Sequence, residues 1–438
     1  MSATTFSPRF VKHRGITVIQ KLDPALPRVP RGKVGLVLAG GAVAGGAFKA
    51  GGLRALDESL VRRKLPGMSA HAFSLNEFDV FVGLSAGSVL AAVLAAGIVP
   101  DEIFRILQGR SDVYDAFQPW HFMQPDVSEI FARIPRWLGK EQELFTNWLS
   151  GATNPRTGQR YELGTTLAKM FEATARLLPT GLFDPRALAV YLKRQMARAG
   201  FPDDFAGAVR QTGKELYLTA TDLNKGEIVV FGHDEPYGHV PISSAIAASC
   251  ALPLWYRPLS VDNPRAGEKG EPARLDLVDG GLMRTANVRV AVEKGCDLVV
   301  CYNPFTRIRY DRAGRNLSDH GMPTIASQSI RTLIGARLDL AKEVVFLDPA
   351  VQADVVFIEP AEDDYDFFTM GALNFWAKDR AANHGYAAVR ASIDASHELL
   401  AEVFANHGIE LRRPPPMSSP RPAANVEMRE SRGVRKAR

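Results

Sequence analysis

The chain has 438 residues, of which 46% are hydrophobic and 23% are charged, and this composition excludes collagen-like, wholly disordered and disulfide-rich classes. Residues 411–438 hold eight basic and two acidic side chains, which gives them a net charge of +6. The whole chain has a net charge of +5, so the other residues together carry −1. We therefore expect no basic face for nucleic acid. The three cysteines form no C-x-x-C pair, which predicts a reducing, cytoplasmic location. The nine histidines show no ligand spacing, so we expect neither a metal nor a cofactor.

Three segments follow one another along the chain. Residues 1–32 are broken by charges and prolines and lack the apolar stretch of a secretory signal, so we expect an irregular leader. Residues 33–409 read as the folded domain. Residues 410–438 are rich in proline and basic residues and predict a disordered basic tail. No apolar run reaches the ~18 residues of a membrane-spanning helix, which leaves peripheral contact with a membrane as the only kind expected.

Within the domain, short apolar runs alternate with helical patterns, which favours a layered α/β fold. Four of the runs are almost continuously apolar, as expected of parallel strands that are covered on both faces: 34–39, 78–83, 297–303 and 355–359. Two more runs, 216–222 and 228–232, predict a hairpin. Helical segments are predicted at 85–96 and 241–251. Residues from about 112 to 204 predict a helical insertion, which serves either as ordinary cover or as a lid.

The first motif with chemical meaning is Gly83-Leu-Ser85-Ala-Gly87, which matches G-x-S-x-G. An apolar strand leads into it and a small-residue helix follows, so the serine lies on a sharp strand-to-helix turn. Side chains at Gly83 and Gly87 would collide across this turn. The context predicts that Ser85 is a nucleophile at the N-terminus of a helix.

A second strand–turn–helix passes through a glycine-rich loop about 40 residues earlier. The loop lacks the G-x-G-x-x-G and G-K-[ST] signatures of nucleotide-binding turns. Beside a nucleophile elbow, its backbone N–H groups are suited to an oxyanion hole. The predicted donors are Gly40, Gly41, Ala42, Gly45 and Gly46.

The third motif is an apolar strand that ends in Asp279-Gly280-Gly281. Because two glycines follow the carboxylate, no side chain crowds its approach to a neighbouring hydroxyl. No other motif supplies a general base for Ser85. The combination predicts that Asp279 is that base, although D-G alone is also a common turn.

The order of glycine loop, G-x-S-x-G and D-G-G resembles patatin-like phospholipases, and the resemblance extends over residues 33–305. The hairpin sequence that begins at Ala220, the helix sequence that begins at Ser243 and Asn287 also resemble the family pattern. The resemblance implies a three-layer α/β/α fold with a largely parallel central sheet. It also implies a Ser85–Asp279 dyad that cleaves carboxylic esters of phospholipids or other acyl lipids through an acyl-enzyme.

The glycine loop departs from the family pattern G-G-G-x-R/K-G. Ala42 replaces the third glycine, and the basic residue is absent. This leaves a second hypothesis open, namely a non-catalytic scaffold of the same fold that binds lipid or protein. A third hypothesis is an esterase with a Ser-Asp-His triad, for which His384 is the best-placed histidine.

Overall fold

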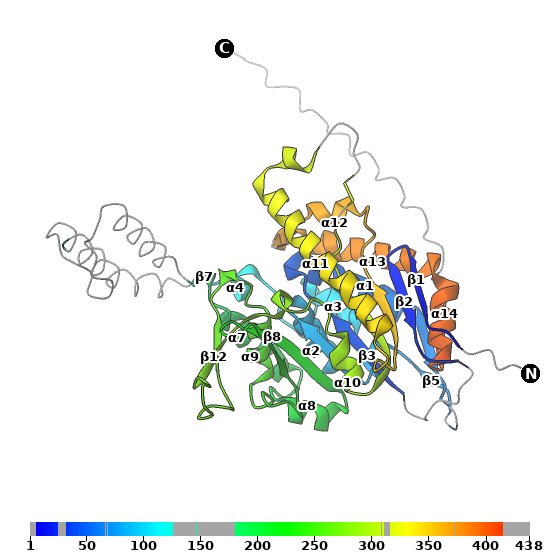
Figure 1. Ribbon diagram of the computed structural model, residues 1–438, viewed down its shortest axis with the longest axis horizontal. Helices are drawn as coiled ribbons and strands as arrows, with labels where there is room; N and C mark the ends of the chain where they lie inside the picture. The colour runs from blue at the N-terminus through cyan, green and yellow to red at the C-terminus, as the bar shows by residue number, and fades with distance from the viewer. Residues whose placement is uncertain are drawn as a thin grey trace, which may run out of the picture.

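The computed structural model describes residues 6–24, 32–65, 67, 69–125, 146, 180–307, 309–310, 316–372 and 374–414. Its centre is a ten-stranded sheet with the order β1-β2-β14-β13-β3-β6-β8-β12-β11, in which β9 also pairs with β8 (Figure 1). The strands are β1 (Arg9–His13), β2 (Ile16–Gln20), β3 (Lys33–Leu38), β6 (Val80–Leu84), β8 (Glu215–Asp222), β9 (Glu227–Phe231), β11 (Leu259–Asp262), β12 (Arg274–Asp279), β13 (Cys296–Tyr302) and β14 (Asp354–Ile358).

The five central strands, from β14 to β8, run parallel to one another, and the outer strands pair antiparallel. Successive residues of a strand point to opposite faces, and both faces are buried here. In β3, Leu36 and Leu38 enter one apolar core while Val37 enters the other. This explains why the central strands are continuously apolar in sequence. The strand order and directions confirm the predicted α/β fold with a largely parallel sheet. The predicted hairpin is also present, because β9 pairs antiparallel with β8.

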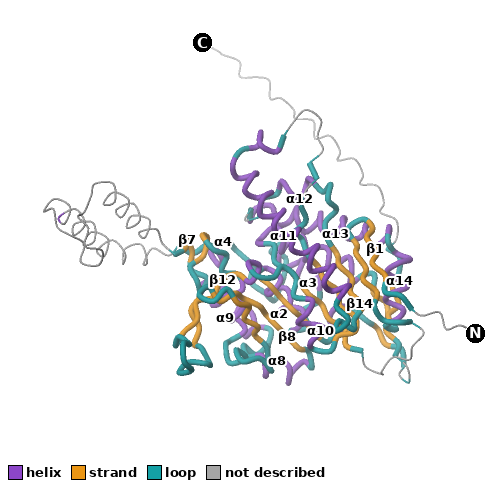
Figure 2. The backbone as a smooth tube through the Cα atoms, in the orientation of Figure 1, coloured by secondary structure: helices purple, strands orange, loops and turns teal. Residues whose placement is uncertain are grey.

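Helices cover both faces of the sheet, which produces three layers (Figure 2). One face packs against α10 (Val288–Glu293) and α11 (Met322–Leu347). The helices whose apolar side chains join the other core are α1 (Ala42–Asp57), α2 (Ala86–Ala95), α3 (Pro100–Leu107), α4 (Pro119–Phe122), α7 (Arg186–Arg198), α8 (Phe205–Thr212), α9 (Ile242–Ser249), α12 (Tyr365–Thr369), α13 (Lys378–Ala395) and α14 (His397–Asn406). Among the described helices, none combines the length and the apolar character needed to cross a bilayer.

Small residues allow α1 and α13 to pack closely together. A Cβ atom on Gly51 would lie 1.8 Å from the carbonyl oxygen of Ala382, and one on Gly385 would lie 2.0 Å from that of Phe48. Glycine is therefore required on both helices at this crossing. The contact fixes the helix that follows the glycine loop against the rest of the domain.

The remaining elements are short. Two small sheets lie outside the main one, β4 with β5 and β15, and β7 with β10. Their bounds are β4 (Leu60–Arg63), β5 (His71–Ala72), β7 (Gly181–Phe183), β10 (Leu254–Tyr256) and β15 (Ile409–Leu411), and the 3-10 turns are η1 (Leu75–Glu77), η2 (Gly280–Leu282), η3 (Leu317–His320) and η4 (Phe375–Ala377).

The expected boundaries need two corrections. The leader is not irregular at residues 9–20, because β1 and β2 form a hairpin and β2 pairs with β14 at the edge of the main sheet. The domain also extends past 409, since β15 pairs with β4 and the described chain continues to 414. In the predicted insertion, the described parts are mainly α4, β7 and α7. Residues 126–145 and 147–179 of the insertion and 415–438 of the tail lie outside the described residues.

Candidate active site

Ser85 connects β6 to α2 in a strained backbone conformation. Its φ of 52° and ψ of −129° are rare for a residue with a Cβ atom. A Cβ on Gly83 would lie 2.5 Å from the Cα of Ser88, and one on Gly87 would lie 2.1 Å from the carbonyl oxygen of Leu38. Both positions therefore require glycine. This is the geometry of a nucleophile elbow, which presents the serine hydroxyl at a helix N-terminus.

A hydrogen-bond relay from the neighbouring strand holds the elbow in place. The backbone N–H of Ser85 donates to Ser249 Oγ at 2.8 Å, and that hydroxyl donates to the carbonyl of Thr219 at 2.7 Å. The amide of Ser85 is therefore already used, and the residue after the nucleophile, here Ala86, is the one that commonly supplies an oxyanion donor at such an elbow. The sequence contains Ser249 in the resembling helix but gives no sign of this role.

Asp279 ends β12 beside the serine and is 5% exposed. A hydrogen bond with the Ser85 side chain and one from the N–H of Gly281, at 2.8 Å, lower the pKa of its carboxyl, but burial outweighs them and raises that pKa to about 6. A Cβ on Gly280 would lie 2.8 Å from the carbonyl oxygen of Thr219, so glycine is needed there. The structure thus brings together the two residues that the sequence analysis paired as nucleophile and base.

Asn287 supports this arrangement from the N-terminus of α10. Its Nδ2 donates to Thr219 Oγ1 at 2.9 Å, and its side chain is 2% exposed. Thr219 therefore joins Asn287 to the relay that holds the amide of Ser85.

The glycine loop, residues 39–46, lies against the nucleophile. A Cβ on Gly40 would lie 3.3 Å from the Cβ of Ser85, and one on Gly46 would lie 3.1 Å from that of Ala86. Gly41 has a φ of 149°, and Ala42 has a φ of 50°, a left-handed conformation that glycine adopts more easily. Ala42 thus occupies a position at which the backbone favours glycine.

Only part of the loop can supply oxyanion donors. The N–H of Gly45 donates to the carbonyl of Gly41 at 2.8 Å, so Gly45 is not available as a donor, contrary to expectation. Gly46 lies one residue deeper in α1, where helical N–H groups bond within the helix. The predicted donors that remain are Gly40, Gly41 and Ala42, with Ala86 on the opposite side of the site.

Two features of the loop's surroundings are not evident from sequence. Lys49, on α1, is 0% exposed, and its ammonium donates to the carbonyls of Ala39 and Gly40. After β13, Pro304 and Phe305 cover the loop, with the Phe305 ring 3.1 Å from where a Gly40 Cβ would lie. A lone lysine within a helix usually reads as a surface residue.

The histidine of the triad hypothesis is engaged elsewhere. His384, on α13, contacts Asp364 Oδ1 at 2.7 Å and Oδ2 at 2.8 Å, and that hydrogen bond raises the pKa of the imidazole. Among the described residues, the histidine side chains that form hydrogen bonds have partners other than Ser85 and Asp279. The geometry therefore favours a dyad over a triad.

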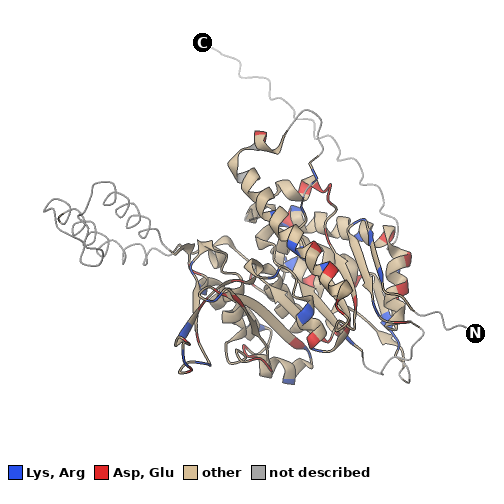
Figure 3. Cartoon of the chain, viewed as in Figure 1, with Lys and Arg blue, Asp and Glu red and all other residues tan. Residues whose placement is uncertain are grey.

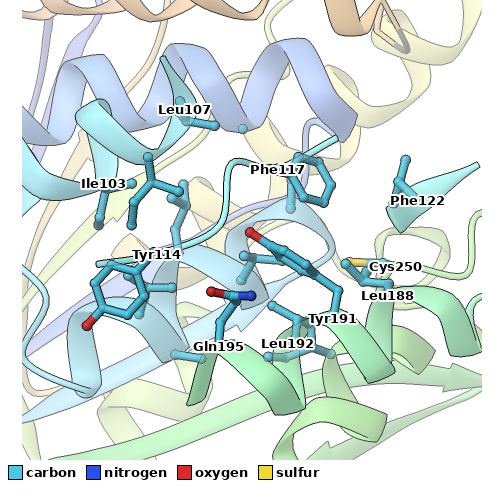
Figure 4. A pocket seen from close by; sticks show the side chains of 18 of the residues that line it. Ile103, Leu107, Tyr114, Phe117, Phe122, Leu188, Tyr191, Leu192, Gln195 and Cys250 are labelled. Atoms are coloured by element: carbon cyan, nitrogen blue, oxygen red, sulfur yellow. The ribbon is translucent and has the colours of Figure 1, made fainter. Parts of the chain in front are cut away.

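An apolar cavity of about 170 Å³ opens beside Ser85 (Figure 4). Figure 4 shows Ile103 and Leu107 from α3 on one side and Leu188, Tyr191 and Leu192 from α7 on the other. Ala42, Ala86 and Cys250 also line it, so the cavity adjoins the candidate oxyanion loop. Such a lining suits a hydrocarbon chain rather than a polar ligand.

Charged groups are distributed without a dominant sign over the described elements in the view of Figure 3. Within the described ranges, no group of three or more His, Cys, Asp or Glu side chains is arranged to hold a metal ion. The three cysteines are free and buried.

The solved structures that are similar to this chain include the following three. VipD from Legionella pneumophila is 14% identical with a TM-score of 0.31, over 88% of this chain and 72% of that one. Full-length ExoU from Pseudomonas aeruginosa, in complex with SpcU, is 19% identical with a TM-score of 0.28, over 92% and 70%. Human GIVD cytosolic phospholipase A2 is 13% identical with a TM-score of 0.38, over 86% and 60%.

No curated protein matches the chain. The family model described as patatin-like phospholipase matches residues 36–292, which include the glycine loop, the elbow and the aspartate. The chain belongs to the patatin-like phospholipase family.

Proposed function

We propose that the protein is a lipid acyl hydrolase that cleaves carboxylic esters with a Ser85–Asp279 dyad. The observation that carries this proposal is a serine with a strained backbone at a strand-to-helix elbow, beside a buried Asp279 whose carboxyl pKa the Ser85 side chain lowers. Strain of this kind concentrates at functional sites. Family membership supports the same class of reaction.

In the first half-reaction, Ser85 Oγ attacks the ester carbonyl and its proton passes to Asp279. The carbonyl oxygen becomes an oxyanion, to which the N–H groups of Gly40, Gly41, Ala42 and Ala86 can donate. Collapse of the tetrahedral intermediate breaks the ester C–O bond, and the proton on Asp279 goes to the departing alkoxide. The products are an alcohol and an acyl-Ser85 ester.

In the second half-reaction, a water molecule attacks the acyl-Ser85 carbonyl and gives its proton to Asp279. A second oxyanion forms in the same place and collapses with release of a fatty acid. The proton returns to Ser85 Oγ, so the dyad is restored. For Asp279 to act as base it must be ionised, which a pKa of about 6 allows at neutral pH.

The apolar cavity supports an acyl lipid as substrate. Its walls between α3 and α7 would hold the acyl chain while the ester carbonyl stays at Ser85. The cavity thus supports phospholipids or related acyl lipids as substrates, with the polar part of the lipid outside it.

We also propose peripheral contact with a lipid surface. Exposed apolar side chains lie close in sequence to residues that line the cavity: Trp120 is 64% exposed on α4, which carries Phe122, and Trp376 is 80% exposed on η4, which Lys378 follows. Tryptophan is favoured at membrane–water interfaces. Trp376→Ala should weaken binding to phosphatidylcholine vesicles without changing hydrolysis of a soluble ester; equal vesicle binding by both proteins would contradict this contact.

The scaffold hypothesis has one observation in its favour, the strained alanine at position 42. Hydrolysis of a medium-chain nitrophenyl ester and of a phospholipid panel by wild type and Ser85→Ala decides between the two. Turnover by wild type alone supports the hydrolase. If both proteins are inactive on every substrate, the scaffold hypothesis takes its place.

A further inference from the structure

The glycine loop is anchored from behind by a lysine of its own helix. Lys49 lies two turns into α1, and its side chain is completely buried. Its ammonium donates to the carbonyl oxygen of Ala39 and, at 2.9 Å, to that of Gly40. Burying an ammonium is costly unless strong hydrogen bonds compensate for the lost water. The two carbonyls that compensate belong to the residues just before the candidate oxyanion donors.

Peptide geometry turns these two bonds into a constraint on the N–H groups. In a trans peptide the C=O and the N–H are fixed in one plane and point in opposite directions. The carbonyl of Ala39 shares its peptide with the N–H of Gly40, and the carbonyl of Gly40 shares its peptide with the N–H of Gly41. Holding both carbonyls toward Lys49 therefore directs both N–H groups away from it.

The other side of the loop is the reaction site. A Cβ on Gly40 would lie 3.3 Å from the Cβ of Ser85, and Ala42 lines the apolar cavity together with Ser85. A peptide flip at residues 40–41 would exchange donors for carbonyl oxygens at this place, and an oxyanion would then be repelled. The loop, residues 39–46, has four glycines and no basic side chain, and Gly40 and Gly41 give it little intrinsic resistance to such a flip.

We propose that Lys49 is a positioning residue that fixes the Gly40 and Gly41 peptides with their N–H groups toward the oxyanion. Lys49 does not touch the substrate; it acts through the loop carbonyls and through its charge. This inference rests on the proposed hydrolase function, because it assigns the oxyanion donors of that reaction.

The charge of Lys49 acts on the base as well. The titratable groups that interact with it are Asp279, Cys250 and Cys301. Burial raises the pKa of both thiols far above neutral, so Asp279 is the charged neighbour. Lys49 lowers the pKa of the Asp279 carboxyl, and burial lowers the pKa of Lys49 itself to about 7. The lysine is thus largely charged in the pH range in which Asp279 titrates.

The test compares Lys49→Met with Leu53→Ala, a control on the same helix. Leu53 is also 0% exposed but does not line the cavity, so its loss destabilises α1 without touching the loop. Loss of a single oxyanion donor typically lowers kcat by about 10²–10³. We expect Lys49→Met to lower kcat on that order with KM nearly unchanged, and to move the acidic limb of the pH profile to higher pH. Leu53→Ala should lower Tm and leave both kinetic readouts close to wild type.

A readout that needs no turnover is hydrogen–deuterium exchange of the segment 37–46. Exchange should be faster in Lys49→Met than in wild type and unchanged in Leu53→Ala. If Lys49→Met does not fold, Lys49→Gln keeps N–H donors on a neutral side chain and should show the same pH shift with a smaller loss of kcat.

Failure of the proposed hydrolase function and failure of the role of Lys49 give different results. A wild type that neither hydrolyses esters nor reacts at Ser85 overturns the proposed function, and the exchange data then decide alone whether Lys49 anchors the loop. An active wild type with Lys49→Met of equal kcat, equal pH midpoint and equal exchange overturns the role of Lys49.

Discussion

The pH dependence of hydrolysis follows from the environment of Asp279. Burial raises the pKa of its carboxyl from 3.8 to about 6 in spite of the hydrogen bonds from Ser85 and Gly281. The base must be ionised to accept the serine proton, so kcat/KM should rise with pH, with a midpoint of about 6. An aspartate with an ordinary pKa would already give the full rate at pH 5.

The assay is the initial rate with a soluble nitrophenyl ester between pH 4.5 and 8.5, with each sample stopped and read at one alkaline pH. Ser85→Ala provides the blank at every pH. A rate that stays constant from pH 4.5 to 7 would refute the assignment of a buried carboxylate as base.

The same shift has a consequence for stability. A carboxyl whose pKa is higher in the folded state than in the unfolded state binds its proton more tightly when folded. Wild type should therefore lose about 3 kcal/mol of unfolding free energy as the pH rises from about 4 to above 6, at 1.36 kcal/mol per pKa unit. Asp279→Asn has no such ionisation, so its stability relative to wild type should increase over this interval. A difference in unfolding free energy that does not vary with pH would contradict the shift.

Three further predictions concern the backbone and the cavity. Ala42→Gly should raise the unfolding free energy by up to about 1 kcal/mol, because φ at this position is 50°, while activity is kept; calorimetry that shows a loss would contradict the strain. Ser85→Gly and Ser85→Ala should both be inactive, but the glycine variant should be more stable by about 1 kcal/mol, and equal Tm values would argue against a strained elbow. Met196→Trp should reduce hydrolysis of long-chain esters more than that of short-chain esters, because Met196 lines the cavity; a uniform change across chain lengths would place the acyl chain elsewhere.

The parts of the fold that sequence predicts are those in which local pattern and burial agree. The central strands β3, β6, β13 and β14 are buried on both faces, so their apolar runs are unmistakable. Strand β1 has the sequence RFVKH and is exposed throughout, so its backbone pairing with β2 leaves no apolar pattern to read. Strand β15 forms its pairs with β4, more than 300 residues away, which local pattern cannot reveal.

In the candidate site too, some residues can be predicted from the sequence and others cannot. Ser85 and Asp279 are predictable because sharp turns at strand ends impose glycines around them. Ser249 and Lys49 each act through two hydrogen bonds to backbone atoms of other segments. Nothing in their immediate sequence distinguishes them from other helical residues, so only the three-dimensional arrangement reveals them.

The most direct test of the dyad is covalent labelling with an alkyl fluorophosphonate, followed by mass spectrometry of the digested protein. The account predicts a single phosphonyl group on Ser85, with labelling slowed strongly in Asp279→Asn and unaffected in His384→Ala. Absence of label on Ser85 in the folded wild type, or labelling that depends on His384 rather than Asp279, would contradict it.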